Sequence, residues 1–492
     1  MKKKEILLIF LILVGVFIVR LYRFNNPIAD WHSWRQADTS AVSRNFVKDG
    51  FDLLHPRMDN ISNVQSGKDN PQGYFFVEFP LYNAAQAGLF KFFGVLTLEE
   101  WGRVISIISS CLITLFLYLI VRRHSNQTIG LLSAFFYAFT PYNIYYGRTI
   151  LTDTSMVMAT LGAIYFFDRY LDVIARSESR LNREKTTKQS QTGSILFYLL
   201  ALVFTAGALL LKAHALFFVL PIVYLAWKKF GFKLFFQWQL WFFAIVAIAP
   251  LAAWRNWMTQ FPEGIPASNW LFNGNGIRFR PSFFRWIFYE RLTILISGYF
   301  GVVLALIGIY RMKKLKEWLF FVAFFLSSLI YVCVVATGNV QHDYYQIPIM
   351  PSVAILFAIG TYFLSQWSLS KVPVGKILVV VCILLGFYFS WQHVKDFFNI
   401  NNKSIIVAGE AVDRLTPKDA KVIANYNGDS SFLYQTKRKG WASFEASLPE
   451  MVKKGASYLV LVNPTKEDQG LSKEYKIVSE TQDYILFDLK NK

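Results

Sequence analysis

The stretch SILFYLLALVFTAGALLL, residues 194–211, decides the fold of this chain. It carries no charged side chain over its whole length, and a helix of about 18 residues spans roughly 27 Å, close to the thickness of a bilayer core. The stretch therefore predicts a membrane-spanning helix. Similar apolar runs predict ten further spans, at about 6–22, 104–121, 129–147, 152–171, 213–228, 236–254, 286–310, 318–337, 347–366 and 377–393. We expect an α-helical polytopic membrane protein with about 11 transmembrane helices.

The overall composition agrees with a membrane protein. Hydrophobic residues make up 54% of the 492 residues and charged residues only 17%, whereas soluble domains have about 25% charged residues. The net charge of +19 does not indicate a nucleic-acid partner, because the chain has no basic soluble domain and no nucleic-acid-binding motif. The three cysteines all fall inside apolar runs, so we expect no disulfide framework.

Basic loops predict the orientation in the bilayer. With MKKK (1–4) in the cytoplasm and eleven spans, five basic loops fall on the cytoplasmic side, as the positive-inside rule requires. The first run lacks a signal-peptide cleavage site and is expected to remain as an anchor. Counting residues 80–96 as a span would place all five basic loops on the outer side of the membrane, so we predict an interfacial helix there. The basic loops are 121–127, 175–190, 227–233, 311–318 and the segment around Lys371 and Lys376.

The pattern also predicts two domains and a compartment. Residues 1–393 form the transmembrane domain, whose long first outer loop, 23–103, carries juxtamembrane helices. Residues 394–492 alternate short strand-like and helix-like segments, which predicts a soluble α/β domain. We expect a bacterial inner membrane, with the N-terminus cytoplasmic and the C-terminal domain periplasmic or extracellular.

The stretch WHSWRQADTSAVSRNF, residues 31–46, follows the first span. Read as a helix, it places Arg35 and Asp38 on one face. One interpretation is an amphipathic juxtamembrane helix with an Arg–Asp pair and a belt of indoles. The other is an active site, in which Asp38 removes a proton from an acceptor hydroxyl and Trp31 and Trp34 contact a sugar.

Two further corners bring charge to the outer face. In YYGRTILTDT (145–154), Arg148 and Asp153 either close a hairpin as a salt bridge or contact ligand, Asp153 orienting an acceptor or metal and Arg148 reaching an anionic group. In LLLKAHALFFVLP (209–221), Lys212 and His214 are either polar turn residues or contacts for a lipid phosphate.

The last outer corner is QHDYYQIPIMP (341–351), which enters a span. An aromatic belt explains Tyr344 and Tyr345, but it does not explain the adjacent His342 and Asp343, so a ligand-binding role is favoured here.

These residue types indicate one chemistry. The sequence has no zinc-protease motif, no nucleophile elbow and no phosphate-binding glycine loop. Cations at headgroup depth suit the leaving phosphate of a polyprenyl-phosphate-linked sugar, because they stabilise the negative charge that develops on it. A carboxylate on the opposite side of the sugar would activate the acceptor, which gives inversion at the anomeric carbon.

The motifs WRQADT (34–39), GRTILTDT (147–154) and HDYYQIPIMP (342–351) resemble those of the GT-C superfamily. The likeness, over about residues 1–390, is to bacterial proteins of glycosyltransferase family 39 related to dolichyl-phosphate-mannose–protein mannosyltransferases and aminoarabinose lipid A transferases. It implies a polyprenyl-phosphate-linked donor, an outer active site, Asp38 and Asp153 as catalytic acidic residues, and Arg148, Lys212 and His342 as contacts of the donor phosphate or sugar. With the residues of the corners above, the candidate set for binding the substrate and the donor phosphate is Arg35, Arg148, Lys212, His214, His342, Tyr344 and Tyr345.

The sequence departs from this family at two places. Ala37 precedes Asp38, where many members have a paired acidic motif, and EFPLYN (78–83) has Glu78 where relatives have a basic or histidine residue. The acceptor therefore stays open between a glycolipid, a polysaccharide and a protein. A divalent metal is an open question as well, with Asp38 or Asp153 as its candidate ligands.

Two other functions compete with a transferase. A transporter or flippase of lipid-linked sugars would use the same cations to bind the headgroup, but it needs charged residues along a path through the bilayer. A scaffold presenting the C-terminal domain leaves the outer corners unexplained. The predicted spans are apolar in their middle parts, which favours the enzyme.

Overall fold

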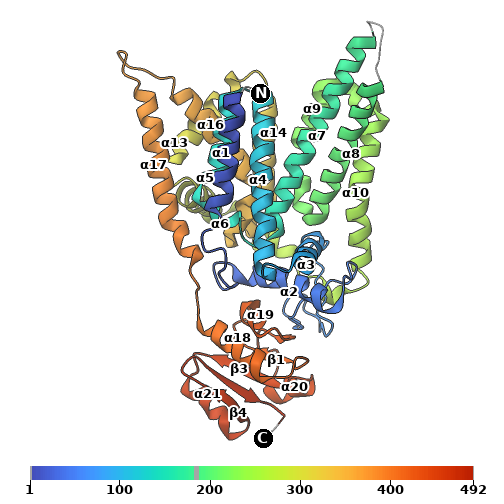
Figure 1. Cartoon of the computed structure of the whole chain (residues 1–492), viewed down its shortest axis with the longest axis vertical. Coiled ribbons are helices and arrows are strands. Elements are labelled where there is room, and N and C mark those ends of the chain that lie inside the picture. The colour runs from blue at the N-terminus through green and yellow to red at the C-terminus, as the bar shows by residue number, and fades with distance from the viewer. Residues whose placement is uncertain (1–2, 182–187, 491–492) are drawn as a thin grey trace.

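The computed structural model describes residues 3–181 and 188–490. Most of the chain forms a bundle of helices, and a small mixed sheet lies beyond one end of it (Figure 1). We call this end the sheet end and the opposite one, where the chain starts, the N-terminal end. Residues 182–187 of the predicted basic linker 175–190 lie outside the described residues.

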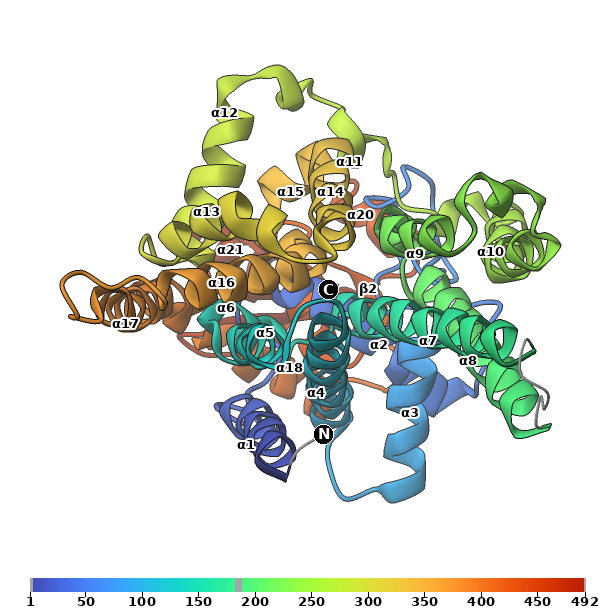
Figure 2. The same cartoon turned by 90° about the horizontal axis from the view of Figure 1, so that it is seen from above.

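The first half of the chain supplies the first helices of the bundle and the helices at the sheet end. Helix α3 lies crosswise to the bundle axis (Figures 1 and 2), in agreement with an interfacial position. The elements are α1 (Lys3–Val19), α2 (Ser33–Asp49), α3 (Leu81–Phe93), α4 (Leu98–His124), α5 (Gln127–Phe139), α6 (Pro141–Tyr146), α7 (Thr152–Leu181), α8 (Lys188–Leu211), η1 (Ala213–Phe218), α9 (Leu220–Phe230), η2 (Gly231–Phe236) and α10 (Trp238–Met258).

The second half completes the bundle. A loop with short helical turns leads from α10 to η5, and α17 brings the chain back to the sheet end. The elements are η3 (Pro262–Gly264), α11 (Asn269–Asn273), η4 (Ile277–Phe279), α12 (Pro281–Phe284), η5 (Arg285–Ile296), α13 (Gly301–Arg311), η6 (Met312–Lys314), α14 (Trp318–Val334), α15 (Ala336–Gln341), η7 (Asp343–Ile349), α16 (Met350–Leu364), α17 (Val374–Val394) and η8 (Lys395–Phe398).

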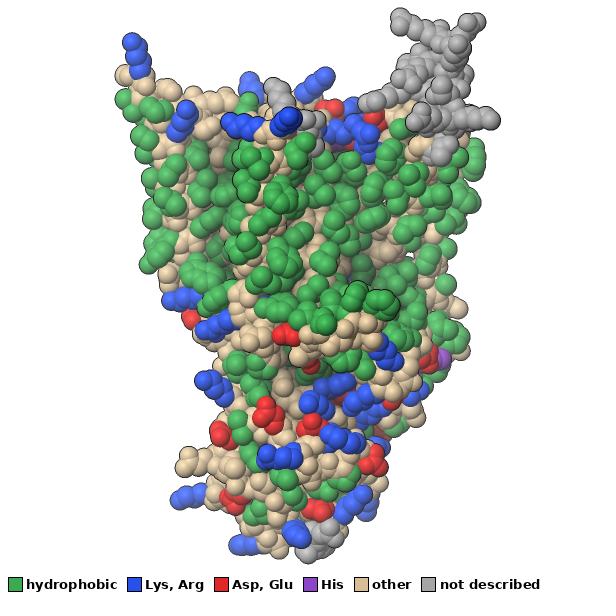
Figure 3. Space-filling view, in the orientation of Figure 1, with side chains coloured by type: hydrophobic (Ala, Val, Ile, Leu, Met, Phe, Trp, Pro, Cys, Tyr) green, Lys and Arg blue, Asp and Glu red, His purple; other side chains and the backbone are tan. Residues whose placement is uncertain are grey.

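The bundle has the surface of a membrane protein. On the face shown in Figure 3, a wide band of hydrophobic side chains covers the helices, and Lys and Arg side chains lie mainly along its edges. Among the described residues, six helices are long and apolar enough to cross a membrane, and a bent helix pair would make a seventh. Helices also occupy the other predicted ranges, as α1, α5, α7 and α14. The count of eleven spans stays a prediction.

The predicted span over 286–310 is wrong as one continuous helix. The helical segments on either side of residues 297–300 are bent by 116° relative to each other. Gly298 at the break has φ +51°, and a Cβ there would lie 1.9 Å from the carbonyl oxygen of Gly386 on α17. Only glycine fits this close approach without strain, so packing against α17 accommodates a bend that hydropathy does not reveal.

The C-terminal sheet region, α18 to β5, contains the predicted strands and helices. Its five strands have the order β2-β1-β3-β5-β4, with parallel pairs among β2, β1 and β3 and antiparallel pairs among β3, β5 and β4. The sequence pattern missed the short α19 and β2. The elements are α18 (Ser404–Leu415), β1 (Val422–Ala424), α19 (Ser430–Thr436), β2 (Gly440–Trp441), α20 (Leu448–Lys453), β3 (Tyr458–Val462), α21 (Lys466–Gly470), η9 (Leu471–Lys473), β4 (Lys476–Glu480) and β5 (Tyr484–Asp488).

Gly360 tests how tightly the bundle is packed. A Cβ at Gly360 on α16 would lie 1.9 Å from the carbonyl oxygen of Leu304 on α13, so Gly360→Ala must push the two helices apart. We expect Gly360→Ala to lower the free energy of unfolding by about 1–3 kcal/mol, measured by thermal unfolding in detergent. Gly207→Ala on α8 is the control, because nothing lies within 4 Å of its Cβ position. Equal melting temperatures for the two variants would contradict the packing described here.

Candidate active site at the sheet end

Helix α2 carries charged side chains into a buried position. Most of its residues are buried, although the helix is rich in polar side chains. Its polar groups find partners on the neighbouring α3: Asn83 donates to the carbonyl oxygen of Thr39 at 2.6 Å, and Ser43 donates to Gln86 at 2.7 Å. Because these groups are hydrogen-bonded, a polar helix can be buried at little cost.

Arg35 of α2 forms the first buried ion pair. One guanidinium nitrogen lies 2.7 Å from each carboxylate oxygen of Glu78, and both side chains are only 8% exposed. Thr152 donates to the same carboxylate at 3.3 Å. Burial is the largest single effect and would raise the pKa of Glu78, but the charges of Arg35 and Lys212 and the hydrogen bonds from Arg35 and Thr152 together outweigh it and hold this pKa below its usual value. Glu78 is therefore ionised and fixes the position of Arg35.

Lys212 forms the second buried pair. Its ammonium nitrogen lies 2.8 and 2.9 Å from the two oxygens of Asp153. Lys212 stands in the turn between α8 and η1, and Asp153 lies in the first turn of α7. The ammonium group lies 5.1 Å from the ring centre of Tyr345 and 5.7 Å from that of Tyr344, within the range of cation–π attraction.

The two pairs form one site. The charge of Lys212 interacts with Glu78 and Arg35 as well as with Asp153. We call these four residues the cation–carboxylate cluster. It joins the first loop, α7 and the α8–η1 turn, and its two cations lie in a setting of low dielectric, where their attraction for an anion is strong.

Asp38 on α2 is more buried than the sequence indicated. Its side chain is 3% exposed, and its oxygens accept from Ser430 at 2.6 Å and from Gln65 at 3.4 Å. Burial raises the pKa of Asp38 to about 6, partly opposed by the Ser430 hydrogen bond and by Arg35. A carboxylate with this pKa is ionised at neutral pH and can still accept a proton, as a general base must.

Asp343 connects several elements around the site. Its carboxylate accepts from Trp31 at 3.0 Å, pairs with His32 at 2.5 Å and accepts from the hydroxyl of Tyr146. Arg291 lies 3.7 Å away. These four partners come from the first loop, α6 and η5, so Asp343 holds the start of η7 in place. Sequence reasoning favoured a ligand-binding role for His342 and Asp343 together and did not predict these partners of Asp343.

His342 belongs to an aromatic group beside the cluster. Its ring centre lies 5.6 Å from Trp34, 5.9 Å from Trp270 and 5.5 Å from Tyr344. Burial, and then the neighbouring His32, lower the pKa of His342 to about 4. Its ring is therefore neutral at physiological pH and suits contact with a sugar better than contact with a phosphate. Trp270, on the loop after α10, was missed by sequence reasoning.

Trp31, Arg148 and His214 have other surroundings. Trp31 stacks on Phe397 with ring centres 5.0 Å apart. Arg148 pairs with Asp30 at 3.1 Å, and both side chains are about 1% exposed. The rings of Tyr331 and Tyr345 lie 5.5 and 5.9 Å from the ring of His214.

The structure corrects two ion pairs proposed from the sequence. Asp153 pairs with Lys212 instead of Arg148, because the chain turns before α7 and leaves Arg148 facing Asp30. Arg35 hydrogen-bonds Glu78 instead of Asp38, although its charge still acts on Asp38.

The described residues do not form an evident metal site. Within 3–181 and 188–490, no three His, Cys, Asp or Glu side chains group closely enough to hold a metal ion. The two candidate ligands have different partners, Ser430 for Asp38 and Lys212 for Asp153. This donor set does not fit a metal ion, so we derive no step that uses one.

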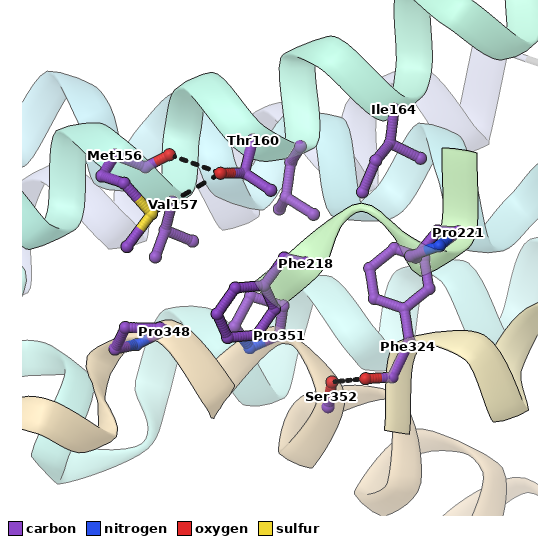
Figure 4. Close-up of a pocket in the computed structure, with 11 residues that line it drawn as sticks. Met156, Val157, Thr160, Ile164, Phe218, Pro221, Phe324, Pro348, Pro351 and Ser352 are labelled. Carbon is purple, nitrogen blue, oxygen red and sulfur yellow. Dashed lines mark hydrogen bonds between the residues drawn. The ribbon is translucent and has the colours of Figure 1, made fainter. Parts of the chain in front are cut away.

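Apolar cavities lie next to the cluster. A small one follows Asp153 by one turn of α7 and is lined from α7, the η1–α9 turn, α14 and the start of α16 (Figure 4). A larger cavity of about 360 Å³ lies between α8, α9 and α10. Leu209 and Leu216, on either side of Lys212 in the chain, belong to its lining. Charged groups and apolar space thus adjoin, as an amphipathic lipid phosphate requires.

Comparisons with known proteins agree with the sequence motifs. Residues 74–180, which include Glu78 and Asp153, match the family model described as dolichyl-phosphate-mannose-protein mannosyltransferase. A sequence search among curated proteins finds no match.

Solved structures share the whole fold. ArnT from Cupriavidus metallidurans, bound to undecaprenyl phosphate, is similar with a TM-score of 0.64 at 11% identity, over 98% of this chain and 97% of that one. The Archaeoglobus fulgidus oligosaccharyltransferase in the apo form has a TM-score of 0.58 at 11% identity, over 92% and 69%. The archaeal oligosaccharyltransferase AglB from Archaeoglobus fulgidus, in complex with an inhibitory peptide and a dolichol-phosphate, has a TM-score of 0.53 at 12% identity, over 92% and 69%. Together with the family match, this shared fold confirms the resemblance to the GT-C superfamily.

The Lys212–Asp153 pair can be tested by removing one charge at a time. Lys212→Met leaves the Asp153 carboxylate, 1% exposed, without its partner, so we expect the free energy of unfolding to fall by about 3–5 kcal/mol. Adding Asp153→Asn should restore part of this loss. Arg285→Met, which breaks the exposed pair of Arg285 and Glu290, is the control and should change little. Equal melting temperatures for Lys212→Met and Arg285→Met would show that the buried pair does not form.

Proposed function

We propose that this chain is an inverting membrane glycosyltransferase, which moves a sugar from a polyprenyl-phosphate-linked donor to an acceptor hydroxyl. The observation that carries the proposal is the cation–carboxylate cluster, in which Arg35 and Lys212 are buried together at one end of an apolar helix bundle. The fold shared with ArnT, whose structure holds undecaprenyl phosphate, supports the same donor class.

In the proposed reaction, the acceptor oxygen attacks the anomeric carbon of the donor. The bond between this carbon and the phosphate oxygen breaks, and polyprenyl phosphate leaves with the bonding electrons. Arg35 and Lys212 stabilise the negative charge on the leaving phosphate, and Glu78 and Asp153 keep these cations oriented. Asp38 takes the proton of the acceptor hydroxyl. Attack from the side opposite the phosphate inverts the anomeric centre.

In this proposal Asp153 supports the leaving phosphate through Lys212 and is not the base. Because it is bonded to Lys212 through both oxygens, it acts on the phosphate side of the sugar, and Asp38 is left as the base. Arg148 and His214 support the walls of the site, Arg148 through Asp30 and His214 through its ring contacts.

The proposed location is the outer, periplasmic side of a bacterial inner membrane. The basic residues that close α4, α9 and α13 lie at the opposite end of the bundle from the C-terminal sheet region, which agrees with the positive-inside rule. The site and the C-terminal sheet region would then face away from the cytoplasm, where lipid-linked sugars replace soluble nucleotide donors.

The distribution of charge supports an enzyme over a flippase. The described part of α4 has no charged residue between Arg103 and Arg122, and that of α7 has none between Asp153 and Asp168. A transport path for a charged headgroup would need polar groups at these depths. The charged groups instead gather at the two ends of these helices.

The acceptor class stays open between a glycolipid, a polysaccharide and a protein. The aromatic group of Trp34, His342, Tyr344 and Trp270 offers apolar ring faces of the kind on which sugar rings stack. Its half-buried position beside Lys212 makes it the proposed contact surface for the transferred sugar. Trp31, which has one face covered by Phe397, would contribute its other face.

Asp38→Asn tests the proposed base. Purified protein in liposomes is given radiolabelled undecaprenyl-phosphate monosaccharides, with glycolipid, polysaccharide and peptide acceptors offered in turn, and release of undecaprenyl phosphate is followed. Loss of a general base lowers the rate by about 10²–10⁴-fold. We therefore expect turnover to fall by at least about 10²-fold while donor binding is retained.

Asp69→Asn is the matched control, because Asp69 belongs to the same first loop and is exposed. It should turn over like the wild type. Unchanged turnover in Asp38→Asn would contradict the role of Asp38. Intact donors in every assay, together with equal movement of labelled lipid between leaflets in all variants, would favour a flippase.

A further inference from the structure

The C-terminal sheet region is joined to the first loop along the edge of its sheet. The backbone N–H of Gly440 on β2 donates to the carbonyl oxygen of Asp59 at 3.0 Å, and Ile61 donates back to Gly440 at 2.9 Å. The first loop therefore continues the sheet beyond its edge strand β2, as a parallel bridge between Asn60 and Gly440. An edge strand paired in this way fixes the register of the two partners.

Helix α19 of the C-terminal sheet region packs on α2. The guanidinium carbon of Arg44 lies 3.9 Å from the ring centre of Tyr434, and Arg44 donates to the carbonyl oxygen of Tyr434 at 3.0 Å. Arg44 also pairs with Asp59, so one buried cation joins α2, the first loop and α19. This arrangement places the start of α19 directly over Asp38.

Two adjacent serines at the start of α19 differ in their contacts. The hydroxyl of Ser430 lies 2.6 Å from Oδ1 of Asp38 and 3.1 Å from the carbonyl oxygen of Trp34. The hydroxyl of Ser431 is also buried, but the carboxylate it interacts with is that of Asp429, not that of Asp38. Both residues are buried serines of the same helix, but only Ser430 reaches the carboxylate of Asp38.

Charged groups from several elements surround the carboxylate of Asp38. Arg35 on α2 favours the ionised carboxylate, whereas Asp429 before α19 and Asp59 in the first loop oppose it. Burial has the largest effect and raises the pKa of Asp38 to about 6, and the Ser430 hydrogen bond is the strongest influence in the other direction. Around these groups lie Arg44 and Tyr434, Glu99 of α4 bonded to Tyr434, and the neutral amides Gln65, Asn83 and Gln86.

We propose that the C-terminal sheet region is a working part of the active site, in which Ser430 is a positioning residue that orients the Asp38 carboxylate by donating a hydrogen bond to it. This inference rests on the proposed function, in which Asp38 removes the acceptor proton. The hydroxyl holds Oδ1 of Asp38, and Oδ2, whose hydrogen bond from Gln65 is long at 3.4 Å, is the oxygen offered to the acceptor. A base supplied by the transmembrane part thus reaches its working orientation only when the C-terminal sheet region is docked.

The test compares Ser430→Ala with Ser431→Ala in the full-length protein. Protonation of Asp38 is followed by infrared difference spectroscopy against pH, with its carboxyl band assigned by its loss in Asp38→Asn. A hydrogen bond from Ser430 favours the ionised form, so its removal should move the titration midpoint upward from about 6 by about 1 pH unit. Ser431→Ala should titrate like the wild type.

Turnover supplies the second readout, with the radiolabelled undecaprenyl-phosphate monosaccharides as probes. The base acts when ionised, so turnover falls as the pH drops through the pKa of Asp38. This acid limb should shift to higher pH in Ser430→Ala and stay unchanged in Ser431→Ala. Ser430→Cys, which keeps the size of the side chain with a weaker donor, should shift both curves in the same direction and replaces Ser430→Ala if that variant does not fold.

The outcomes separate the two proposals. An unchanged titration midpoint in Ser430→Ala and Ser430→Cys overturns the inference, whatever the turnover. A loss of turnover that is equal at every pH also overturns it, because that marks a merely structural contact. If the midpoint shifts in Ser430→Ala but Asp38→Asn turns over normally, the hydrogen bond exists and the proposed role of Asp38 is wrong.

Discussion

The burial of charge at the sheet end is the constraint on which the rest of this structure depends. A charged side chain loses several kcal/mol of hydration when it is buried, and it is stable only when a partner of opposite charge restores that loss. Arg35 and Lys212 each have such a partner within 3 Å, Glu78 and Asp153. The first pair joins two parts of the first loop, the second joins α7 to the α8–η1 turn, and the hydrogen bond from Thr152 to Glu78 connects the loop to the helix bundle.

This constraint links the site to its supports. Asp343 collects donors from the first loop, α6 and η5, and Arg148 is held by Asp30 beneath the same loop. The C-terminal sheet region extends this support through the first loop, which continues its sheet beyond β2. Cations that attract a phosphate, a carboxylate that accepts a proton and aromatic rings that contact a sugar are thereby brought together by segments from the whole length of the chain.

The sequence predicted much of this arrangement and missed some of it for physical reasons. Apolar runs located the helices, and costly charges at the ends of these runs marked Asp153, Lys212 and His342. Pairing partners were not predictable, because Glu78 and Asp30 lie in a loop whose path depends on tertiary packing. The bend at Gly298 was missed since hydropathy does not report backbone contacts. Ser430 could not be connected with Asp38, because the two residues are 392 positions apart in the sequence.

Binding of the lipid phosphate tests the central claim most directly. Undecaprenyl phosphate is titrated into detergent-solubilised wild type, the neutral pair Arg35→Gln/Glu78→Gln and the neutral pair Lys212→Met/Asp153→Asn, and the bound fraction is measured by native mass spectrometry. Each double variant removes one cation without leaving a carboxylate unpaired. The account predicts saturable binding to the wild type, weakened at least about tenfold in each double variant, as loss of a charge-assisted contact implies. Equal affinity in all three proteins would contradict it.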